Sequence, residues 1–400
     1  MVRCENGVPE VAQCHPEMYE TLLSEKVSTF QSMLAEAAGD TTLRVQDVFG
    51  SEKQNFRMRA SFKMWREDSD VHYVMYNKQE EGRGPPHQVL SYPMGSLQIN
   101  ALMPRLIDEL TRVDELRFKI NDVRFLTTTT GDALVSITYN RPIEEEIWAP
   151  AAVELARALS ESSGSSSGDG GGAVKIVGRS RKIKIAIGGE ETVSETLTVP
   201  NGRGECHYTQ TEGAFTQPNA KVCEQMLGWA YEATKGSEGG DLCELYCGNG
   251  CFTVALAPNF RRVIATEMSK ASVHLAEANL ERNGIDNVRV ARLTAEEFSE
   301  AHAGTRRFHR LAEAGIALGA NSGLQFTTLF VDPPRAGLDE QCRELARTFG
   351  KVVYISCNPE TLARDVAALR KSHQVTKVAA FDQFPYTEHL ECGVVLERRV

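Results

Sequence analysis

Cys357 stands where a cysteine could act as a nucleophile. It follows an apolar run in the segment ISCNPET (Ile355–Thr361) and precedes an Asn-Pro pair. The run predicts a buried strand, and we expect a helix to begin around Pro359. The positive end of a helix lowers the pKa of a nearby thiol and favours the thiolate, which is the nucleophilic form. The alternative is a small buried residue, as most cysteines are.

A glycine-rich turn upstream predicts a nucleoside site. Gly248 lies in the segment CELYCGNGCF (Cys243–Phe252), where a buried strand turns into a helix. Glycines let the backbone approach a ligand, and a helix N-terminus favours an anionic group. Glu267 ends the next strand, 19 residues later (267 − 248), where a carboxylate can accept both ribose hydroxyls. The turn lacks the G-x-G-x-x-G pattern, which favours S-adenosylmethionine over NAD. The alternative is a purely structural turn.

Acidic residues complete the candidate chemistry. Asp332 begins the turn DPPR (Asp332–Arg335) directly after a strand, at the edge where open α/β sheets bind ligands. Such turns also occur in enzymes that methylate exocyclic amines of bases, and the alternative is a rigid loop with a solvated Asp. Glu391 directly precedes the last strand and is a candidate general base, as are Glu388 and His389. A cofactor turn, a substrate-edge carboxylate, a nucleophile and a base together suit covalent methyl transfer to carbon.

The elements that must position these residues alternate along the second half of the chain. Strands are predicted at Leu242–Tyr246, Val263–Thr266, Val288–Val290, Thr328–Val331, Lys351–Ile355, Val375–Phe381 and Cys392–Glu397. Helices are predicted at Cys223–Thr234, Ala271–Asn283, Asp339–Thr348 and Glu360–Ser372. This alternation predicts an α/β fold with a parallel, doubly wound sheet. The last two strands follow each other without a helix. In this the chain is similar to Rossmann-like methyltransferases, whose last strand is inserted antiparallel by a hairpin, and we expect the same here.

The first part of the chain predicts a mixed α+β domain. Its predicted elements are the strands Met58–Trp65, Val71–Tyr76, Val123–Thr129 and Ala133–Tyr139 and the helices Ser96–Glu115 and Pro150–Leu159. Ser160–Gly172 (SESSGSSSGDGGG) predicts a flexible loop, because it has no apolar side chain to bury. We expect it to be an insertion inside this first domain, because a basic strand pair on either side of Gly188 and Gly189 follows it. We therefore expect an RNA-recognition domain at residues 1–200 and a methyltransferase domain at residues 201–400.

Charge and composition narrow the partners and the compartment. The net charge of −10 argues against indiscriminate nucleic-acid binding. Two basic segments, Phe56–Arg66 and Lys175–Lys184, could still form a local RNA-binding face. The candidate RNA-binding residues are Arg57, Arg59, Lys63, Arg179 and Arg181. No apolar run approaches the length of a membrane span. With 10 cysteines and no visible export signal, we expect free thiols in the cytoplasm, or in an organelle after removal of a leader.

Three cysteines beside the glycine turn raise the alternative of a metal or iron–sulfur site. Cys243, Cys247 and Cys251 form a C-x₃-C-x₃-C pattern. The first two are expected along or at the end of a buried strand, whereas Cys251 lies at the start of the next helix, so the three thiols would not converge. We therefore expect no metal and no iron–sulfur cluster.

The chain resembles the tRNA (uracil-5-)-methyltransferase family over nearly its whole length. The segments that carry the resemblance are FRMRASF, GRSRKIKI, FTQPNA, TKGSEGGDLCELYCGNG, IATEMSKASVHLAEANLERNGIDNV, AEEF, FVDPPRAGLD, YISCNPETL and FDQFPYTEHLECGV. The resemblance implies that Cys357 is the nucleophile and Glu391 the base. The implied cofactor-binding residues are Gln217, Tyr246, Gly248, Glu267 and Asp332. One departure is Cys251, where the family's bacterial pattern has Asn, so a side-chain hydrogen bond to the cofactor would be missing.

From this resemblance we expect methyl transfer from S-adenosylmethionine to C5 of uridine 54 in the tRNA T-loop, which gives ribothymidine. The thiolate would attack C6 of uracil, and the base would later remove the C5 hydrogen so that the cysteine can leave. The expected partner is the T-arm of tRNA, with no obligatory protein partner.

Four alternatives stay open at this point. They are a uracil-5-methyltransferase of ribosomal RNA, one of transfer-messenger RNA, an exocyclic-amine methyltransferase, which would have no use for Cys357, and a non-catalytic RNA-folding protein. Many ribosomal-RNA enzymes carry a four-cysteine iron–sulfur site in an N-terminal domain. Only Cys4 and Cys14 precede Cys206 here, so such a cluster could not be built in that part of the chain.

Overall fold

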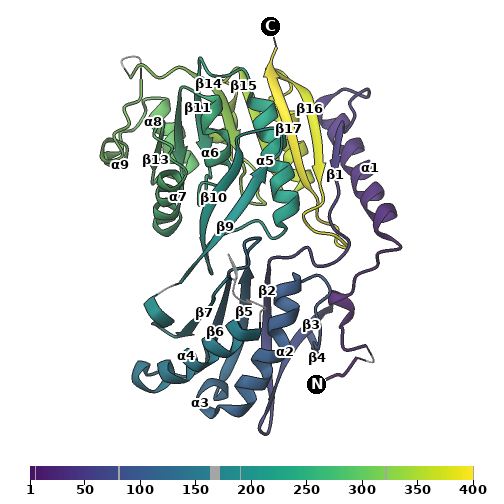
Figure 1. Cartoon of the computed structure of the whole chain (residues 1–400). Coiled ribbons are helices and arrows are strands. Elements are labelled where there is room, and N and C mark those ends of the chain that lie inside the picture. Colours follow the sequence, from purple (N-terminus) through teal and green to yellow (C-terminus); the bar gives the residue numbers. More distant parts are fainter. Residues whose placement is uncertain (5, 80–81, 163–171, 190, 320–321, 400) are drawn as a thin grey trace.

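The computed structural model describes residues 1–400 apart from residues 5, 80–81, 163–171, 190, 320–321 and 400. The described strands form sheets of eight, seven and two strands (Figure 1). Most of the insertion expected at residues 160–172 lies outside the described part of the chain. In the part that is described, no helix has both the length and the apolar character needed to cross a membrane.

The eight-stranded sheet carries the candidate chemistry and has the predicted doubly wound arrangement. Its strand order is β1-β16-β17-β15-β14-β11-β12-β13. The strands are β1 (Asp47–Phe49), β11 (Asp241–Leu245), β12 (Arg262–Thr266), β13 (Val288–Ala291), β14 (Phe326–Val331), β15 (Lys351–Ser356), β16 (His373–Phe381) and β17 (Glu391–Arg398). β11 to β15 pair in parallel, whereas β17 runs antiparallel between β15 and β16. The predicted α/β class and its antiparallel last strand are confirmed.

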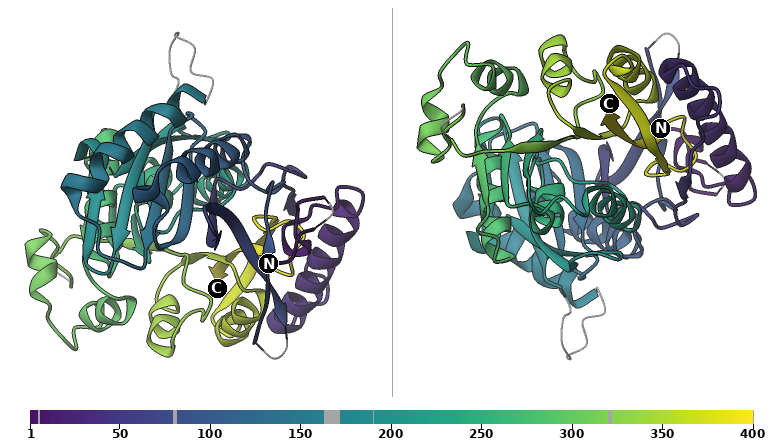
Figure 2. Two further views of the ribbon diagram at one scale, coloured as in Figure 1. Left: turned by 90° about the horizontal axis from the view of Figure 1, so that it is seen from below. Right: turned by 90° about the horizontal axis from the view of Figure 1, so that it is seen from above.

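Helices cover both faces of this sheet (Figure 2). On one face lie α5 (Ala220–Thr234), α6 (Cys251–Leu256) and α7 (Lys270–Arg282), and on the other lie α1 (Tyr19–Ala38), α8 (Ala295–His302), α10 (Glu340–Ala346) and α11 (Pro359–Leu369). Side chains of one strand alternate between the two apolar layers: Val353 and Ile355 join the first, and Val352 and Tyr354 the second. Strands buried on both faces read as continuous apolar runs, which is why the sequence predicted them.

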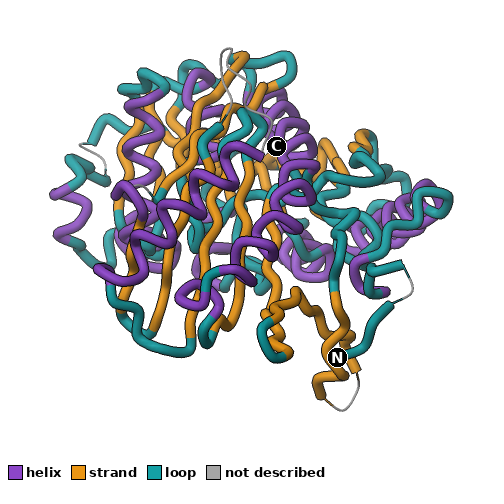
Figure 3. Tube along the Cα trace, turned by 60° about the horizontal axis from the view of Figure 1, so that its bottom comes forward, coloured by secondary structure: helices purple, strands orange, loops and turns teal. Residues whose placement is uncertain are grey.

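The seven-stranded sheet has the order β4-β3-β2-β5-β6-β7-β8. Its strands are β2 (Arg59–Glu67), β3 (Asp70–Gln79), β4 (Gly82–Gln88), β5 (Ile120–Thr127), β6 (Ala133–Tyr139), β7 (Val174–Ser180) and β8 (Ile183–Ala186). The helices α2 (Leu97–Arg112), α3 (Asp114–Arg117) and α4 (Glu145–Ser162) share an apolar core with it, around the fully buried Trp148. Figure 3 distinguishes these helices from the strands.

One predicted pairing is wrong. The strands on either side of Gly188 and Gly189 do not pair with each other: β8 pairs with β7, whereas β9 (Thr192–Val199) pairs with β10 (Gly204–Thr211). Both glycines have positive φ values, 69° and 74°, and they redirect the chain between the two sheets. Leu197 and Tyr208 of the β9–β10 hairpin are buried in the apolar layer formed with α5 and α7, which holds the hairpin against the larger sheet.

The N-terminal segment packs beside the C-terminal strands, which the sequence did not indicate. β1 lies beside β16, with which it pairs in parallel (Figure 1). α1 shares an apolar layer with α11. The expected boundary at residue 200 falls inside the β9–β10 hairpin. The division into residues 1–200 and 201–400 stays a prediction, and residues 19–49 lie with the second of these parts.

Candidate active site

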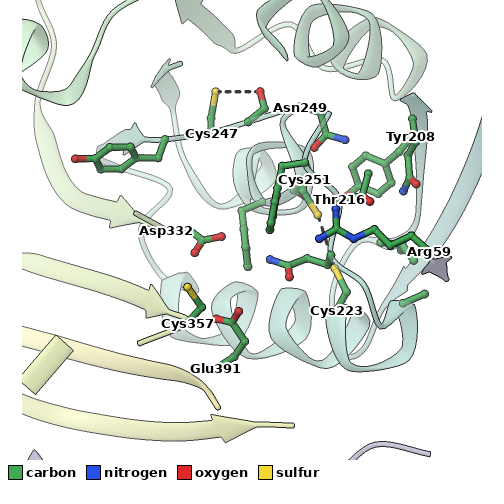
Figure 4. Close-up of a pocket in the computed structure, with 18 of the residues that line it drawn as sticks. Arg59, Tyr208, Thr216, Cys223, Cys247, Asn249, Cys251, Asp332, Cys357 and Glu391 are labelled. Carbon is green, nitrogen blue, oxygen red and sulfur yellow. Dashed lines mark hydrogen bonds between the residues drawn. The ribbon is translucent and has the colours of Figure 1, made fainter. Parts of the chain in front are cut away.

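A cavity of about 540 Å³ lies between the eight-stranded sheet and the seven-stranded part of the chain (Figure 4). Met58 and Leu126 line it from one side, and the turns after the strands of the larger sheet line it from the other. The residues proposed from the sequence that line this cavity are Arg59, Gln217, Tyr246, Gly248, Glu267, Asp332, Cys357 and Glu391. The structure thus brings every predicted catalytic and cofactor-binding residue into one cavity, together with one predicted RNA-binding residue.

Three of these residues come from neighbouring strands. Asp332 follows β14, Cys357 follows β15, and Glu391 is the first residue of β17, which lies beside β15. β14 and β15 are parallel, so their carboxyl ends share one edge, and the antiparallel β17 begins at that same edge. The register pairs Ser356 with Cys392, which places Cys357 next to Glu391 (Figure 4). The carboxyl edge of the sheet therefore assembles a thiol and two carboxyl groups.

The glycine turn is held in a conformation suited to a ligand. Tyr246, Gly248 and Gly250 have positive φ values of 62°, 57° and 81°. Gly248 N–H donates to one carboxylate oxygen of Glu267 at 3.2 Å, and Ser269 N–H donates to the other at 2.7 Å. Glu267 is thus fixed against the turn at the end of β12, where its carboxylate can accept ribose hydroxyls. This arrangement fits the nucleoside part of S-adenosylmethionine.

Gln217 lies just before α5 and presents an unpaired polar atom to the cavity. Its Oε1 is buried and has no hydrogen-bond partner among the described residues. Asn219 caps α5 by accepting from Val222 N–H at 3.2 Å, and its own N–H donates to Gln383 at 3.0 Å. The segment that carries Gln217 is therefore tied to the loop before β17. A buried amide without a partner is unfavourable by itself, so a bound ligand is the expected partner.

The two carboxyl groups have raised pKa values. Glu391 is 3% exposed, and burial, followed by the charge of Asp332, raises its pKa well above the usual value, while Arg335 opposes the rise. Burial raises the pKa of Asp332 to about 7. Because two like charges in one buried site repel each other, ionisation of one carboxyl group disfavours ionisation of the other. Oε2 of Glu391 has no partner in the described part of the chain.

The prediction that a helix N-terminus lowers the pKa of Cys357 is wrong. Burial, Glu391 and Asp332, in that order, raise the pKa of this thiol, and Arg335 lowers it, by its charge and a hydrogen bond. α11 does begin at Pro359 with an Asn358 cap, as expected. The dipole of a helix is a partial charge, however, and it is outweighed by desolvation and two carboxyl groups.

The predicted RNA-binding residues lie in three different surroundings. Arg59 lines the active-site cavity, and its guanidinium lies 5.4 Å from the ring centroid of the exposed Phe215. Arg57 and Arg59 together line an adjoining cavity. Lys63 and Arg179 instead form ion pairs within the protein, with Asp122 at 3.2 Å and Glu212 at 2.9 Å. Arg181 is exposed at the turn between β7 and β8. Contact of these residues with RNA stays a prediction.

Sequence reasoning gave no role to Arg335, the cation beside the thiol. The sequence feature that could have pointed to it is its place in the DPPR turn, which follows β14, the neighbour of the strand that leads to Cys357. The 10 cysteines are free thiols, and Cys251 Sγ lies 3.8 Å from Cys223 Sγ at the cavity wall (Figure 4). In the part of the chain that is described, no group of three or more His, Cys, Asp or Glu side chains could hold a metal ion.

Comparisons with known proteins agree with this site. A family model described as tRNA (Uracil-5-)-methyltransferase matches residues 18–399. A tRNA/tmRNA (uracil-C(5))-methyltransferase of Ectopseudomonas mendocina (strain ymp) is 47% identical over 384 residues, or 96% of this chain and 98% of that protein. A protein of the same name from Vibrio cholerae serotype O1 (strain M66-2) is 43% identical over 385 residues, with the same two shares covered.

A solved structure shows the same fold. It is that of Pyrococcus abyssi tRNA (uracil-54, C5)-methyltransferase in complex with S-adenosyl-L-homocysteine. The TM-score is 0.64 at 18% identity, and the match covers 94% of this chain and 83% of that one. At this identity the likeness supports the fold alone.

The cause of the raised thiol pKa can be tested by alkylation. We expect Asp332→Asn to move the pH dependence of Cys357 alkylation to lower pH, because a neighbouring negative charge disfavours the thiolate. Arg335→Gln should move it to higher pH, because a stabilising cation is lost. Timed labelling with iodoacetamide, followed by mass spectrometry of the peptide that contains Cys357, measures both shifts. Shifts in the same direction for the two variants would contradict this electrostatic account.

Proposed function

This chain belongs to the tRNA (uracil-5-)-methyltransferase family, and on that premise we propose how its residues carry out the reaction. The chain is an S-adenosylmethionine-dependent methyltransferase that acts on C5 of uracil in RNA. The proposal adds the target, uridine 54 of the tRNA T-loop, and the roles of individual side chains. The observation that carries it is the meeting of Cys357, Asp332 and Glu391 at the ends of three adjacent strands, in one cavity with the glycine turn.

The cofactor is held by the glycine turn and its neighbours. Glu267 accepts the ribose hydroxyls, and Tyr246 and Gly248 form the wall beside them. The unpaired amide oxygen of Gln217 and the carboxyl group of Asp332 are the acceptors for the amino group of the cofactor or for the edge of uracil. S-adenosylmethionine supplies the methyl group as an electrophile. Cys251, at the start of α6, offers a thiol where the bacterial family pattern has Asn.

Cys357 activates the target base. Its thiolate adds to C6 of uracil, so that electron density reaches C5 and the carbon becomes nucleophilic. Arg335 is the cation that favours the thiolate against burial and the two carboxyl groups. The target base must leave the stack of the T-loop to reach a cavity of this kind. After methylation, C5 carries both a methyl group and a hydrogen, and the protein is bonded to C6.

Glu391 resolves this adduct. Its carboxylate takes the C5 hydrogen as a proton, the C5–C6 double bond forms again, and the bond between C6 and Cys357 breaks to release the thiolate. A carboxylate whose pKa is raised by burial is a stronger base than an exposed one, which suits removal of a proton from carbon. Glu388 and His389 line a neighbouring cavity and not this one, which favours Glu391 among the three candidates.

In this proposal the RNA binds at the entrance of the cavity. Arg57 and Arg59 offer phosphate contacts there, and Phe215, 60% exposed, offers a ring on which a base can stack. A second candidate target is transfer-messenger RNA, because the relatives from E. mendocina and V. cholerae are named for both RNAs. We place the enzyme in the cytoplasm, since 10 free thiols suit a reducing compartment.

Loss of Glu391 should trap the covalent adduct. Glu391→Gln keeps the shape but cannot accept the proton, so we expect turnover to fall by about 10²- to 10⁴-fold while methylated protein–RNA adduct accumulates. A band that survives denaturing electrophoresis and contains both RNA and the labelled methyl group is the measurement. Cys357→Ala, alone or combined with Glu391→Gln, should give no band and no turnover, while cofactor binding stays close to that of the parent. Normal turnover by Glu391→Gln would place the base elsewhere.

The two cavity arginines should contribute to the electrostatics of tRNA binding. Replacing Arg57 and Arg59 by Gln should weaken binding and reduce the slope of log affinity against log salt by about one to two, because fewer counterions are released. The matched control replaces Arg112 and Arg157, which form ion pairs on the surfaces of α2 and α4 and line neither cavity. Equal salt slopes for the two double variants would refute the assignment.

A further inference from the structure

The connection between β16 and β17 determines where Glu391 lies. It comprises residues 382–390, and Glu391 follows it directly. Its first residues are tied to the surrounding protein by one backbone and one side-chain hydrogen bond: Asp382 N–H donates to Phe49 O at 2.9 Å, and the side-chain Oε1 of Gln383 accepts from Asn219 N–H at 3.0 Å. In the second half of this connection, which leads into Glu391, the Tyr386 hydroxyl donates to the backbone oxygen of Lys53 at 2.7 Å, and a further anchor lies closer to Glu391.

Lys26 of α1 supplies such an anchor. Its Nζ forms an ion pair with Asp382 at 2.5 Å and donates to the backbone oxygens of Phe384 at 3.3 Å and His389 at 3.2 Å. One ammonium group therefore holds both ends of the connection together. Its three donors are matched by three acceptors, which is the full capacity of a lysine.

The ion pair is almost fully removed from water. The Lys26 side chain is 11% exposed and that of Asp382 is 1% exposed. A buried ion pair is weak evidence for a gain in stability, because desolvation offsets much of the attraction between the charges. The geometry that the pair imposes is therefore the more informative property. It joins residues that are 356 positions apart in the chain.

The anchored oxygen lies close to the proposed base. His389 is two residues before Glu391, so fixing its carbonyl sets the path of the backbone into β17. Oε2 of Glu391 is buried and has no partner among the described residues, so that oxygen is not aimed by a hydrogen bond of its own. The direction of the carboxylate therefore depends on the backbone that leads to it.

α1 also connects this anchor with the nucleophile. Phe30 and Leu34 of α1 are buried with Leu362 of α11, the helix that begins two residues after Cys357. Lys26 and Cys357 both line a second cavity of about 670 Å³. One helix thus contacts both the helix that follows the thiol and the connection that precedes Glu391.

We propose that Lys26 is a positioning residue for Glu391, acting through the backbone of residues 382–390. The inference rests on the proposed function, in which Glu391 removes the C5 hydrogen. It assigns Lys26 to the release of the adduct and not to its formation. Methyl transfer precedes proton removal, so misplacing Glu391 leaves the earlier steps intact. A displacement of about 1 Å in a reacting group can lower a rate by about 100-fold.

The experiment separates the two steps in a single turnover. Enzyme in excess is mixed with saturating labelled S-adenosylmethionine and unmodified tRNA, and samples are quenched over time. Denaturing electrophoresis then gives the methylated adduct and the free methylated RNA. For Lys26→Met we expect adduct formation within a few-fold of the parent enzyme and release slowed by about 10- to 100-fold, so that adduct accumulates.

Two further variants distinguish slow release from unfolding and from the general effect of breaking an ion pair of α1. Lys26→Met leaves Asp382 buried without its partner, which can unfold the protein. The double variant Lys26→Met/Asp382→Asn removes both charges, still lacks the bonds to Phe384 and His389, and should show the same slow release. The control Lys53→Met breaks another ion pair of α1, with Glu20 at 3.0 Å, which is exposed and lines neither cavity. It should release the product as the parent enzyme does.

The outcomes distinguish this inference from the function on which it rests. If the folded double variant releases product at the parent rate, or if formation and release slow equally, Lys26 is not a positioning residue for the base. If Glu391→Gln itself accumulates no methylated adduct, the proposed role of Glu391 fails first. Slow release in the Lys26 variants, together with accumulation in Glu391→Gln and normal release in Lys53→Met, supports the proposal.

Discussion

The active site depends on one electrostatic constraint: a thiol and two carboxyl groups share a cavity in which the charge of one disfavours ionisation of the others. Two unit charges 4 Å apart at an effective dielectric constant of 20 repel by about 4 kcal/mol, which is several times the thermal energy. Burial raises the pKa of Asp332 and Glu391, and both in turn raise that of Cys357. The order of the strands imposes this, because β14, β15 and β17 are neighbours and present all three groups at one edge.

Holding such groups together requires anchors from distant parts of the chain. The connection before Glu391 is tied to Phe49 in β1, to Asn219 at the start of α5 and to Lys26 in α1. Asn219 also fixes the segment that carries Gln217. The cofactor side and the Glu391 side of the cavity are therefore linked through one loop, by hydrogen bonds that involve the side chains of Gln383 and Lys26.

The sequence predicted the parts of the site that depend on local order along the chain. Asp332, Cys357 and Glu391 stand next to apolar runs, and alternation of strands and helices places such positions at one edge of a sheet. The pKa of Cys357 was predicted in the wrong direction because it depends on neighbours in space. Lys26 could not be found, since nothing near it in the sequence points to Asp382. The β9–β10 pairing was missed for a similar reason: it depends on burial against α5 and α7.

The same burial that disfavours the Cys357 thiolate strengthens Glu391 as a base, and the two effects act at different steps. Attack on C6 needs an ionised thiol, which the charge of Arg335 supports. Release needs a carboxylate able to take a proton from carbon, and a raised pKa favours that transfer. The ionised carboxylate of Glu391 hinders the thiolate by its charge, and the same carboxylate is the general base that later removes the C5 hydrogen. Arg335 and Asp332 then tune attack and release in opposite directions, because each acts on the thiol and on Glu391 at once.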